Sequence, residues 1–230
     1  MSLLEDVTAK VGDIFSQQWT IKDGQVVPES KNIGLGNEGT KIEGTVLYAD
    51  LDGSTDLVDN NSAEFCAEVY KSFLHLSTKI IRSEGGDVRS FDGDRVMGIF
   101  LGNSKNTSAA SAGLKINYAV QKILNPLAKQ TYNTPPEIKH TVGIDTSELL
   151  AVRTGIRGSN DLVWIGRAAN HAAKLNGLSS DFPTRITKEV FDLLNEKSKF
   201  GGDPISLMWT KANWTETGRE IYRSTWLRTI

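Results

Sequence analysis

The sequence predicts a mixed α+β fold with the element order β-α-β-β-α-β. Short β-branched and apolar runs, typical of buried strands, alternate with segments whose apolar residues recur every three or four positions, which is typical of amphipathic helices. Glycine, proline and aspartate separate these segments and mark the turns. A chain of 230 residues can bury one full core, so we expect one main domain with additions.

The first 43 residues are expected to lie outside that domain. Between Leu3 and Phe15 the apolar side chains follow three- and four-residue spacing, which predicts a short amphipathic helix that covers the core or contacts a second subunit. Residues 16–43 are polar, contain four glycines and one proline, and show no period. We therefore expect a surface arm at residues 16–43 and a domain at residues 44–230.

The core elements follow from residue 44 onward. A strand at residues 46–48 brings Asp50 to its C-terminal end, and Asn61 and Ser62 are good starters for a helix that ends before Gly85. A second helix is expected to stop around Pro126. The remaining core elements are strands at residues 88–91, 95–101 and 138–144, and the second helix itself covers residues 109–127. Together they give the order of a ferredoxin-like sandwich.

The end of the chain adds elements to this sandwich. Residues 149–154 are expected to pair as a separate strand with residues 138–144. Gly166 opens an alanine-rich helix that runs to Leu175. Further strands are predicted at residues 161–165, 184–186, 205–210 and 221–227, and a further helix at residues 188–194.

Two aspartates mark the strongest candidate site. Asp50 follows the first buried strand, and Asp94 stands at the tip of the predicted hairpin. A carboxylate at the end of an apolar run is costly unless a cation or a hydrogen-bond donor meets it. The short polar stretch from Leu51 to Thr55 can turn its backbone N–H groups toward one point, as phosphate-binding loops do.

Two carboxylates beside such a nest are what a pair of divalent cations holding a polyphosphate requires. The alternative is that both aspartates only cap turns, a role that we expect for Asp52 and Asp92.

A second constellation lies in the alanine-rich helix. Asn170 and Lys174 are four residues apart and therefore project from one face. An amide that orients a sugar, followed one turn later by a cation that meets developing phosphate charge, is a plausible catalytic pair. Spacing alone is more typical of a solvated helical face, so that alternative stays open.

Bulk properties exclude several classes. A net charge of −2 argues against a nucleic-acid polymer as partner, and no apolar run is long enough to insert in a membrane. The N-terminus lacks an export signal, and the lone Cys66 is expected to be a buried, inert thiol, which together predict a cytoplasmic protein. The three histidines show no zinc spacing and are expected to be structural: His75, His140 and His171.

Three segments resemble, in order and spacing, the signature segments of the class III nucleotidyl cyclases, the adenylate and guanylate cyclase catalytic domains. They are VLYADLDGST (residues 46–55), FDGDRVMGIF (residues 91–100) and WIGRAANHAAKL (residues 164–175). The resemblance covers about residues 44–175 and implies the class III cyclase fold for the domain at residues 44–230. It also implies an enzyme that cyclises a ribonucleoside triphosphate to a 3′,5′-cyclic monophosphate and releases pyrophosphate.

The resemblance further implies a role for each site residue. Asp50 and Asp94 would bind two Mg²⁺ or Mn²⁺ ions, with the Leu51 carbonyl as a further ligand. Asn170 would position the ribose, and Lys174 would face the α-phosphate. Backbone N–H groups of the phosphate loop would hold the β- and γ-phosphates: Asp52, Gly53, Ser54 and Thr55. The family acts as a wrapped dimer, so a homodimer with two composite sites is expected.

Departures from the family pattern bear on the base. Ser90 and Val163 stand where purine cyclases place hydrogen-bonding residues, and Trp164 follows, so these three are candidates for the base pocket. A site reads a base by the donors and acceptors that it places. Their loss, together with Lys174 in place of arginine, favours the stand-alone bacterial pyrimidine cyclases of anti-phage defence, which make cyclic CMP or cyclic UMP.

Three alternatives remain open at this point. A purine cyclase is the first. A haloacid-dehalogenase-type phosphatase is the second, because Asp50 and Asp52 fit its loop, with Asp50 as nucleophile; the sequence after Gly93 lacks its second aspartate. A catalytically inactive cyclase-like module that binds nucleotide is the third. The sequence does not decide between CTP and UTP, and Lys211 is the late lysine best suited to the γ-phosphate.

Overall fold

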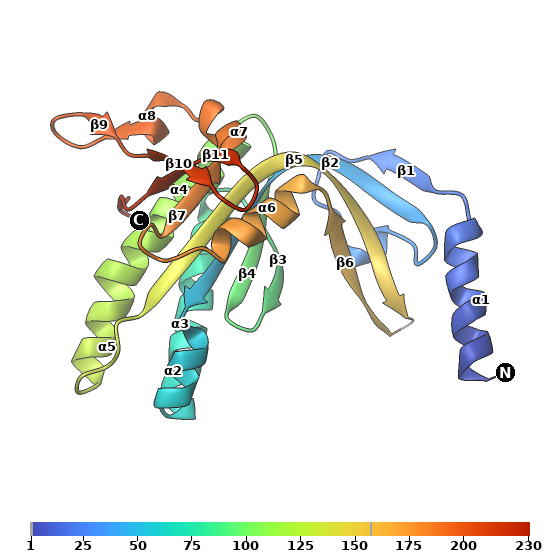
Figure 1. The fold of residues 1–230 in the computed structure, drawn as a ribbon, viewed down its shortest axis with the longest axis horizontal. Helices are drawn as coiled ribbons and strands as arrows, with labels where there is room; N and C mark the ends of the chain where they lie inside the picture. Colours follow the sequence, from blue (N-terminus) through green and yellow to red (C-terminus); the bar gives the residue numbers. More distant parts are fainter. Residues whose placement is uncertain (1, 157) are drawn as a thin grey trace. The chain divides into compact units, whose positions relative to one another are not determined.

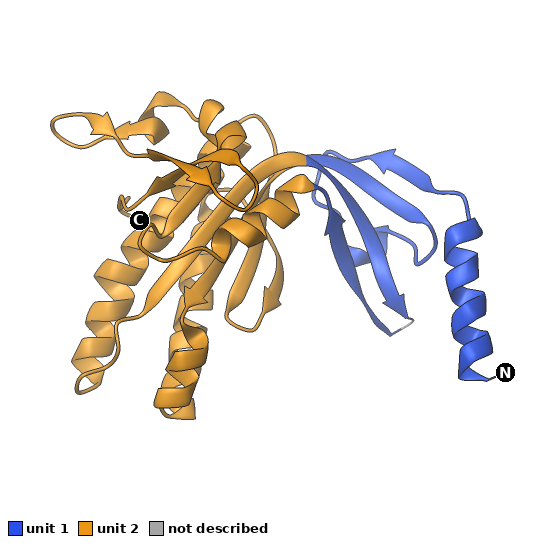
Figure 2. Cartoon of the chain, viewed as in Figure 1, with its two compact units in different colours: residues 1–43, 148–166 blue, residues 44–147, 167–230 orange. Residues whose placement is uncertain are grey.

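The computed structural model describes residues 2–156 and 158–230. The chain divides into two compact units: unit 1, within Met1–Glu43 and Glu148–Gly166, and unit 2, formed by Gly44–Ser147 and Arg167–Ile230 (Figure 2). Residues 148–166 thus group with the N-terminal region. The sequence does not predict this grouping. The expected division into residues 1–43 and 44–230 as domains stays a prediction, and one strand, β2, runs across it.

Unit 2 contains the predicted β-α-β-β-α-β order (Figure 1). The sheet order β10-β11-β7-β5-β2-β4-β3 places the four core strands as β5-β2-β4-β3, with β4 antiparallel to both β2 and β3. This neighbour order confirms the ferredoxin-like α+β prediction. The six elements are β2 (Glu38–Asp52), α3 (Ala63–Ser83), β3 (Asp87–Asp92), β4 (Arg95–Phe100), α4 (Lys105–Ala119) and β5 (Lys139–Ile156).

The two faces of the sheet carry different helices. Val142 and Ile144 of β5 join the buried core formed with α3 and α4. Gly143 lies between them and faces the opposite side, because side chains alternate along a strand. There a Cβ on Gly143 would come within 2.1 Å of the Ala172 carbonyl of α6 (Arg167–Asn176). A glycine is therefore what allows α6 to lie directly on β5.

Two predicted helices differ at their ends. The side chain of Ser62, not Asn61, caps α3 by accepting a hydrogen bond from the Phe65 N–H at 3.3 Å. The predicted stop at Pro126 is wrong, because the helix passes through a π-helical turn, η2 (Val120–Leu124), and continues as α5 (Asn125–Thr131). Pro126 lies in the first turn of α5, where a missing N–H costs little.

The prediction of two strands at residues 138–144 and 149–154 is also wrong, since both belong to the single 18-residue strand β5. Strand β6 (Ser159–Ile165) pairs with its end, from Leu150 to Ile156. The expected surface arm contains β1 (Thr20–Asp23), parallel to the start of β2, and a 3₁₀ turn, η1 (Ser30–Asn32).

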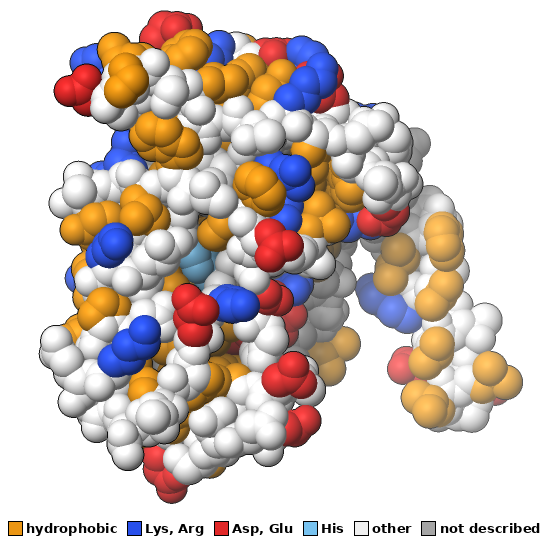
Figure 3. All heavy atoms as spheres, turned by 60° about the vertical axis from the view of Figure 1, so that its left-hand side comes forward, with side chains coloured by type: hydrophobic (Ala, Val, Ile, Leu, Met, Phe, Trp, Pro, Cys, Tyr) orange, Lys and Arg blue, Asp and Glu red, His pale blue; other side chains and the backbone are white. Residues whose placement is uncertain are grey.

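The N-terminal helix is present as α1 (Leu3–Ser16), with Ser2 and Glu5 forming a capping box. None of its residues is buried. Its apolar side chains are largely exposed, Phe15 to 87% and Leu3 to 80%, and the space-filling view shows apolar side chains along its surface (Figure 3). Within unit 1, the helix therefore packs none of its apolar side chains into a core.

The C-terminal elements complete the sheet edge. β7 (Thr184–Thr187) runs parallel to β5, and β11 (Arg219–Ser224) joins β7 to β10 (Thr210–Trp214). The strand predicted at residues 205–210 is wrong in extent, because Ser206–Leu207 forms β9, which pairs with β8 (Phe200–Gly201) in a separate small sheet. Two short helices follow β7 in the chain and precede β8: α7 (Lys188–Asp192) and α8 (Glu196–Lys199). Among the described residues, no helix is long and apolar enough to span a membrane.

Candidate functional site

The ends of β2 and the β3–β4 hairpin bring Asp50 and Asp94 together. Ala49 of β2 pairs with Val96 of β4, so Asp50 lies beside the first residues of β4. Gly93 adopts φ +61°, a conformation that favours glycine, and this tight turn returns the chain at Asp94. The two carboxyl groups interact, and repulsion from Asp94 is one of the causes that raise the pKa of Asp50.

The charge of this pair is only partly balanced. Arg95 donates from Nη2 at 2.7 Å and from Nε at 2.9 Å to one oxygen, Oδ2 of Asp50. Oδ1 of Asp50 and Oδ2 of Asp94 are buried and have no hydrogen-bond partner among the described residues. Burial raises the pKa of the Asp50 carboxyl most, and the hydrogen bond from Arg95 opposes it. Buried carboxylate oxygens without donors are what an incoming cation would complete.

These residues fit a magnesium-type ion. Mg²⁺ is usually held by one or two carboxylates, with water and substrate phosphates as its other ligands. No cluster of three or more His, Cys, Asp or Glu side chains that could hold a metal occurs among the described residues. The two carboxyl groups of Asp50 and Asp94 match such a sparse ligand set, and Leu51 follows Asp50 directly in the chain.

The expected phosphate loop is shorter than predicted. Asp52 still belongs to β2, and its side chain is exposed, as is that of Asp92 at the end of β3. Gly53 (φ +71°) turns the chain directly into a helix, α2 (Ser54–Asn60). Ser54 and Thr55 therefore lie in the first helical turn. Their role in binding phosphate stays a prediction.

Helix α6 presents Asn170 and Lys174 on an exposed face. Its opposite face buries Ala168, Ala169 and Ala172, small side chains that suit the close approach to Gly143. Lys174 forms an ion pair with Glu216, and both side chains are about half exposed. The structure therefore places the two residues together on one surface, with Lys174 held by an acidic neighbour that the sequence does not identify.

Beneath α6 lies a buried acidic residue that sequence reasoning missed. The Asp145 side chain of β5 is 0% exposed and contacts both Arg167 and His171 of α6. A signal exists in the sequence, because Asp145 interrupts the apolar run of β5 and Arg167 and His171 are four residues apart. It cannot be read without knowing that the two segments meet. His171, expected to be structural, therefore has a specific acidic partner.

The three base-pocket candidates lie in different units. Ser90 of β3 is half-buried and pairs with Met97 of β4 in unit 2. Val163 and Trp164 belong to β6 in unit 1, where they pair with Val152 and Ala151. Val163 is exposed and Trp164 is half-buried, and their role in a base pocket stays a prediction.

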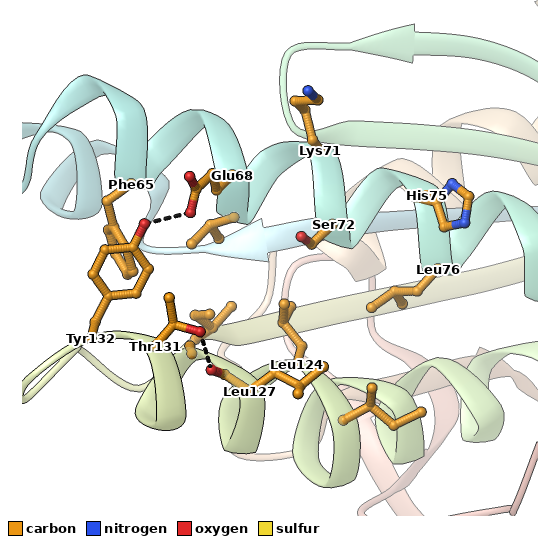
Figure 4. A pocket seen from close by; sticks show the side chains of 14 residues that line it. Phe65, Glu68, Lys71, Ser72, His75, Leu76, Leu124, Leu127, Thr131 and Tyr132 are labelled. Atoms are coloured by element: carbon orange, nitrogen blue, oxygen red, sulfur yellow. Dashed lines mark hydrogen bonds between the residues drawn. The ribbon is translucent and has the colours of Figure 1, made fainter.

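A separate groove of about 520 Å³ lies between α3 and the segment η2–α5. Figure 4 shows side chains such as Phe65, Leu76 and Leu124 lining it, with Tyr132 hydrogen-bonded to Glu68 at one end. The lining contains neither aspartate of the carboxylate pair nor any residue of α6. The groove is therefore not part of the candidate site.

Comparison with known proteins agrees with this geometry. The chain is 47% identical to a uridylate cyclase of Burkholderia cepacia over 232 residues, covering 100% of each chain. It is 45% identical to a uridylate cyclase of Xanthomonas perforans, covering 98% of each chain. The chain belongs to the uridylate cyclase family.

This membership confirms the predicted family, the class III nucleotidyl cyclases, and within it the pyrimidine branch. Among solved structures, the adenylyl cyclase CyaB from P. aeruginosa superimposes with a TM-score of 0.68 at 23% identity, covering 81% of this chain and 95% of that chain. That likeness establishes the class III cyclase fold. No protein-family model matches the chain.

Proposed function

We propose that this protein converts UTP to 3′,5′-cyclic UMP and pyrophosphate. The observation that carries the proposal is the Asp50–Asp94 pair, with one unpartnered oxygen on each carboxyl, in a chain that belongs to the uridylate cyclase family. Because the curated relatives at 37–47% identity are all named uridylate cyclases, we choose uracil over cytosine. Val163 has no hydrogen-bonding side chain, which agrees with a site that does not recognise a purine base.

Asp50 and Asp94, with the Leu51 carbonyl, would hold two Mg²⁺ or Mn²⁺ ions. When bound, these ions supply Lewis-acid activation of the ribose 3′-hydroxyl and neutralise triphosphate charge. The side chains of α6 have separate tasks. The Asn170 amide hydrogen-bonds the ribose and orients its 3′-oxygen, and the Lys174 ammonium lies against the α-phosphate, where negative charge grows in the transition state.

The reaction itself forms one bond and breaks one. The 3′-hydroxyl gives up its proton to solvent, its oxygen attacks the α-phosphorus in line, and the bond from that phosphorus to the bridging oxygen breaks, so that pyrophosphate leaves. Backbone N–H groups of residues 52–55 hold the departing phosphates, as proposed from the family resemblance. Lys174 must exchange its contact with Glu216 for the phosphate, an exchange that costs little because exposed ion pairs contribute about 0–1 kcal/mol.

We further propose a homodimer with two composite sites, in which the carboxylate pair of one subunit meets α6 of the other. Each chain carries both halves, so a two-fold dimer forms two equal sites. The use of the product as a signal in anti-phage defence stays a prediction.

The test is to incubate the purified protein with each of the four ribonucleoside triphosphates and Mn²⁺ and to resolve the products. We expect cyclic UMP as the main product. Cyclic CMP as main product would overturn the choice of base, and cyclic AMP or cyclic GMP would restore the purine alternative. Binding without any turnover would identify an inactive nucleotide-binding module.

The phosphatase alternative is answered by the fold. Its doubly wound sheet consists of parallel strands, whereas β4 lies antiparallel to both of its neighbours here. The same assay provides a second check, because release of inorganic phosphate without a cyclic product is the outcome that this alternative requires.

A further inference from the structure

The buried cluster under α6 is unlike the rest of the helix. Arg167 and His171 are polar and half-buried, and they lie between the alanine face of α6 and its exposed face. Nε of Arg167 and Nδ1 of His171 lie 3.3 Å and 3.2 Å from the same oxygen, Oδ2 of Asp145. One carboxylate therefore contacts two consecutive turns of the helix.

Asp145 is itself held in place from the other side. The Thr187 hydroxyl of β7 donates to Oδ1 of Asp145 at 2.6 Å, and Nη2 of Arg167 reaches the same oxygen at 3.3 Å. Burial raises the pKa of Asp145 most, and the hydrogen bonds from Thr187 and the Thr146 backbone, together with the Arg167 charge, oppose it. A buried carboxylate with several donors of fixed position specifies one geometry, which an apolar contact would not.

The cluster also extends beyond Asp145. Arg167 donates to the Thr146 carbonyl at 2.6 Å and pairs with Glu189 of α7, which in turn contacts Arg219 of β11 at 3.4 Å. The first turn of α6 is tied down as well, because the Ala168 N–H donates to the Ser147 hydroxyl at 3.0 Å. These contacts fix the start of α6 against β5 and α7.

Helix geometry connects this cluster to the working face. Successive residues of an α-helix are rotated by about 100°, so Asn170 and Lys174 form a stripe that lies about 60° from the stripe of Arg167 and His171. The C-terminal end of α6 is held by Leu175, which is buried, and by Asn176, which donates to the Thr141 carbonyl at 2.8 Å. At the N-terminal end, small residues bring the helix close to β5, and its rotation there is set by the directional hydrogen bonds that Arg167 donates to Oδ1 of Asp145 and to the Thr146 carbonyl.

We propose that Asp145 is a positioning residue of the cyclase: through Arg167 and His171 it fixes the rotation of α6 and thereby aims Asn170 and Lys174. The inference rests on the proposed function in that these two residues serve a composite site. It differs from a general stabilising role in one respect. The defect caused by losing Asp145 must fall on the α6 half of the site and spare the carboxylate half.

Complementation between variants tests this directly. In a mixed dimer of Asp50→Asn and Asn170→Ala chains, one of the two sites has both halves intact, so activity should return. We expect Asp145→Asn to recover activity when coexpressed with Asp50→Asn but not with Asn170→Ala. The positioning role would be overturned if Asp145→Asn recovered activity with Asn170→Ala, or if it recovered activity with neither Asp50→Asn nor Asn170→Ala. If the reference mixture of Asp50→Asn and Asn170→Ala stayed inactive, that result would instead count against the composite site.

Single-variant kinetics provide a test that does not need mixed dimers. Thr187→Val keeps the shape but removes the hydroxyl that holds Asp145, whereas Thr187→Ser keeps the hydroxyl. We expect kcat to fall about 10-fold for Thr187→Val and up to about 100-fold for Asp145→Asn, with KM for UTP changed less than about threefold. Thr187→Ser should keep near wild-type kcat. Equal kcat for the serine and valine variants would contradict the proposal.

A matched control separates position from charge. Asp192 is an exposed aspartate on α7, paired with Lys188, and takes no part in the cluster. Asp192→Asn should leave kcat and both complementation results unchanged. Melting temperatures of all variants identify any chain that fails to fold. If Asp145→Asn fails to fold, Thr187→Val replaces it in the mixtures, with the same expected pattern.

Discussion

The two halves of the candidate site are built on opposite plans. The carboxylate half, at the ends of β2 and the β3–β4 turn, leaves one buried oxygen on each of Asp50 and Asp94 without a hydrogen-bond partner in the part of the chain that the structure describes. The α6 half directs its buried polar groups inward, where Asp145 meets Arg167, His171 and Thr187, and leaves Asn170 and Lys174 exposed. The carboxylate half is arranged so that a ligand completes it. The α6 half is arranged so that internal contacts keep the orientation of its exposed face constant.

The largest effect should come from the half that a ligand completes. Replacing Asp50 or Asp94 with Asn keeps the shape and removes the charge that would hold a divalent ion. We expect cyclisation of UTP to fall by at least about 10²-fold, the loss typical of removing one electrostatic catalytic group. Product formation under saturating UTP and Mn²⁺ measures it. Near wild-type activity in either variant would show that the carboxylate half is not completed by a metal ion.

A pH effect should arise in β5, the strand that also carries Asp145. Burial lowers the pKa of His140 to about 4, so the folded chain holds this residue neutral where an unfolded chain would protonate it. The stability that this group contributes is present above pH 6.5 and is lost as pH falls from 6.5 toward 4, by about 3 kcal/mol.

Urea unfolding at several pH values measures this loss. His140→Gln should flatten the slope of unfolding free energy between pH 6.5 and 4, because an amide does not take up the proton. An unchanged slope in the variant would assign the pH dependence to other groups.

Arg95 offers a way to sharpen the comparison on the carboxylate side. Its guanidinium neutralises Asp50 in the structure, at a place where an added cation would compete with it. Arg95→Met should lower the melting temperature without metal by about 2–4 °C, the shift for about 1 kcal/mol in a chain of this size. Added Mn²⁺ should then raise the melting temperature more than in the wild type.

Thermal unfolding with and without Mn²⁺, in the absence of nucleotide, gives both numbers. A variant that gains no more from Mn²⁺ than the wild type would show that Arg95 does not compete with the ion.

The smallest effect is expected at the exposed ion pair of the α6 half. Glu216→Gln releases Lys174 but removes only a contact between half-exposed groups. The free energy of unfolding should therefore change by less than about 1 kcal/mol, and kcat by less than about fivefold. Lys174→Ala, measured beside it, should lower kcat by about 10²-fold. A large loss in the glutamine variant would show that Glu216 orients Lys174 and that the working face is less independent than we propose.

Much of the fold could be predicted because its signals are local. The run that precedes Asp50, the glycine turn before Asp94 and the alanine-rich stretch of α6 each describe one element, and each lies where the sequence places it. The failures are also local. Pro126 follows a π-helical turn that lets the helix continue. Residues 149–154 extend β5 because no residue between positions 144 and 149 breaks the strand.

By itself, the sequence determined the β-α-β-β-α-β order, the two aspartates at strand ends and the helix that carries Asn170 and Lys174. Only the tertiary structure decided that Arg95 balances Asp50 from 45 residues away and that Asp145 lies beneath Arg167 and His171. The physical reason is that such contacts depend on the pairing of strands distant in sequence and on how closely a helix approaches the sheet. Periodicity and local spacing carry no information about either.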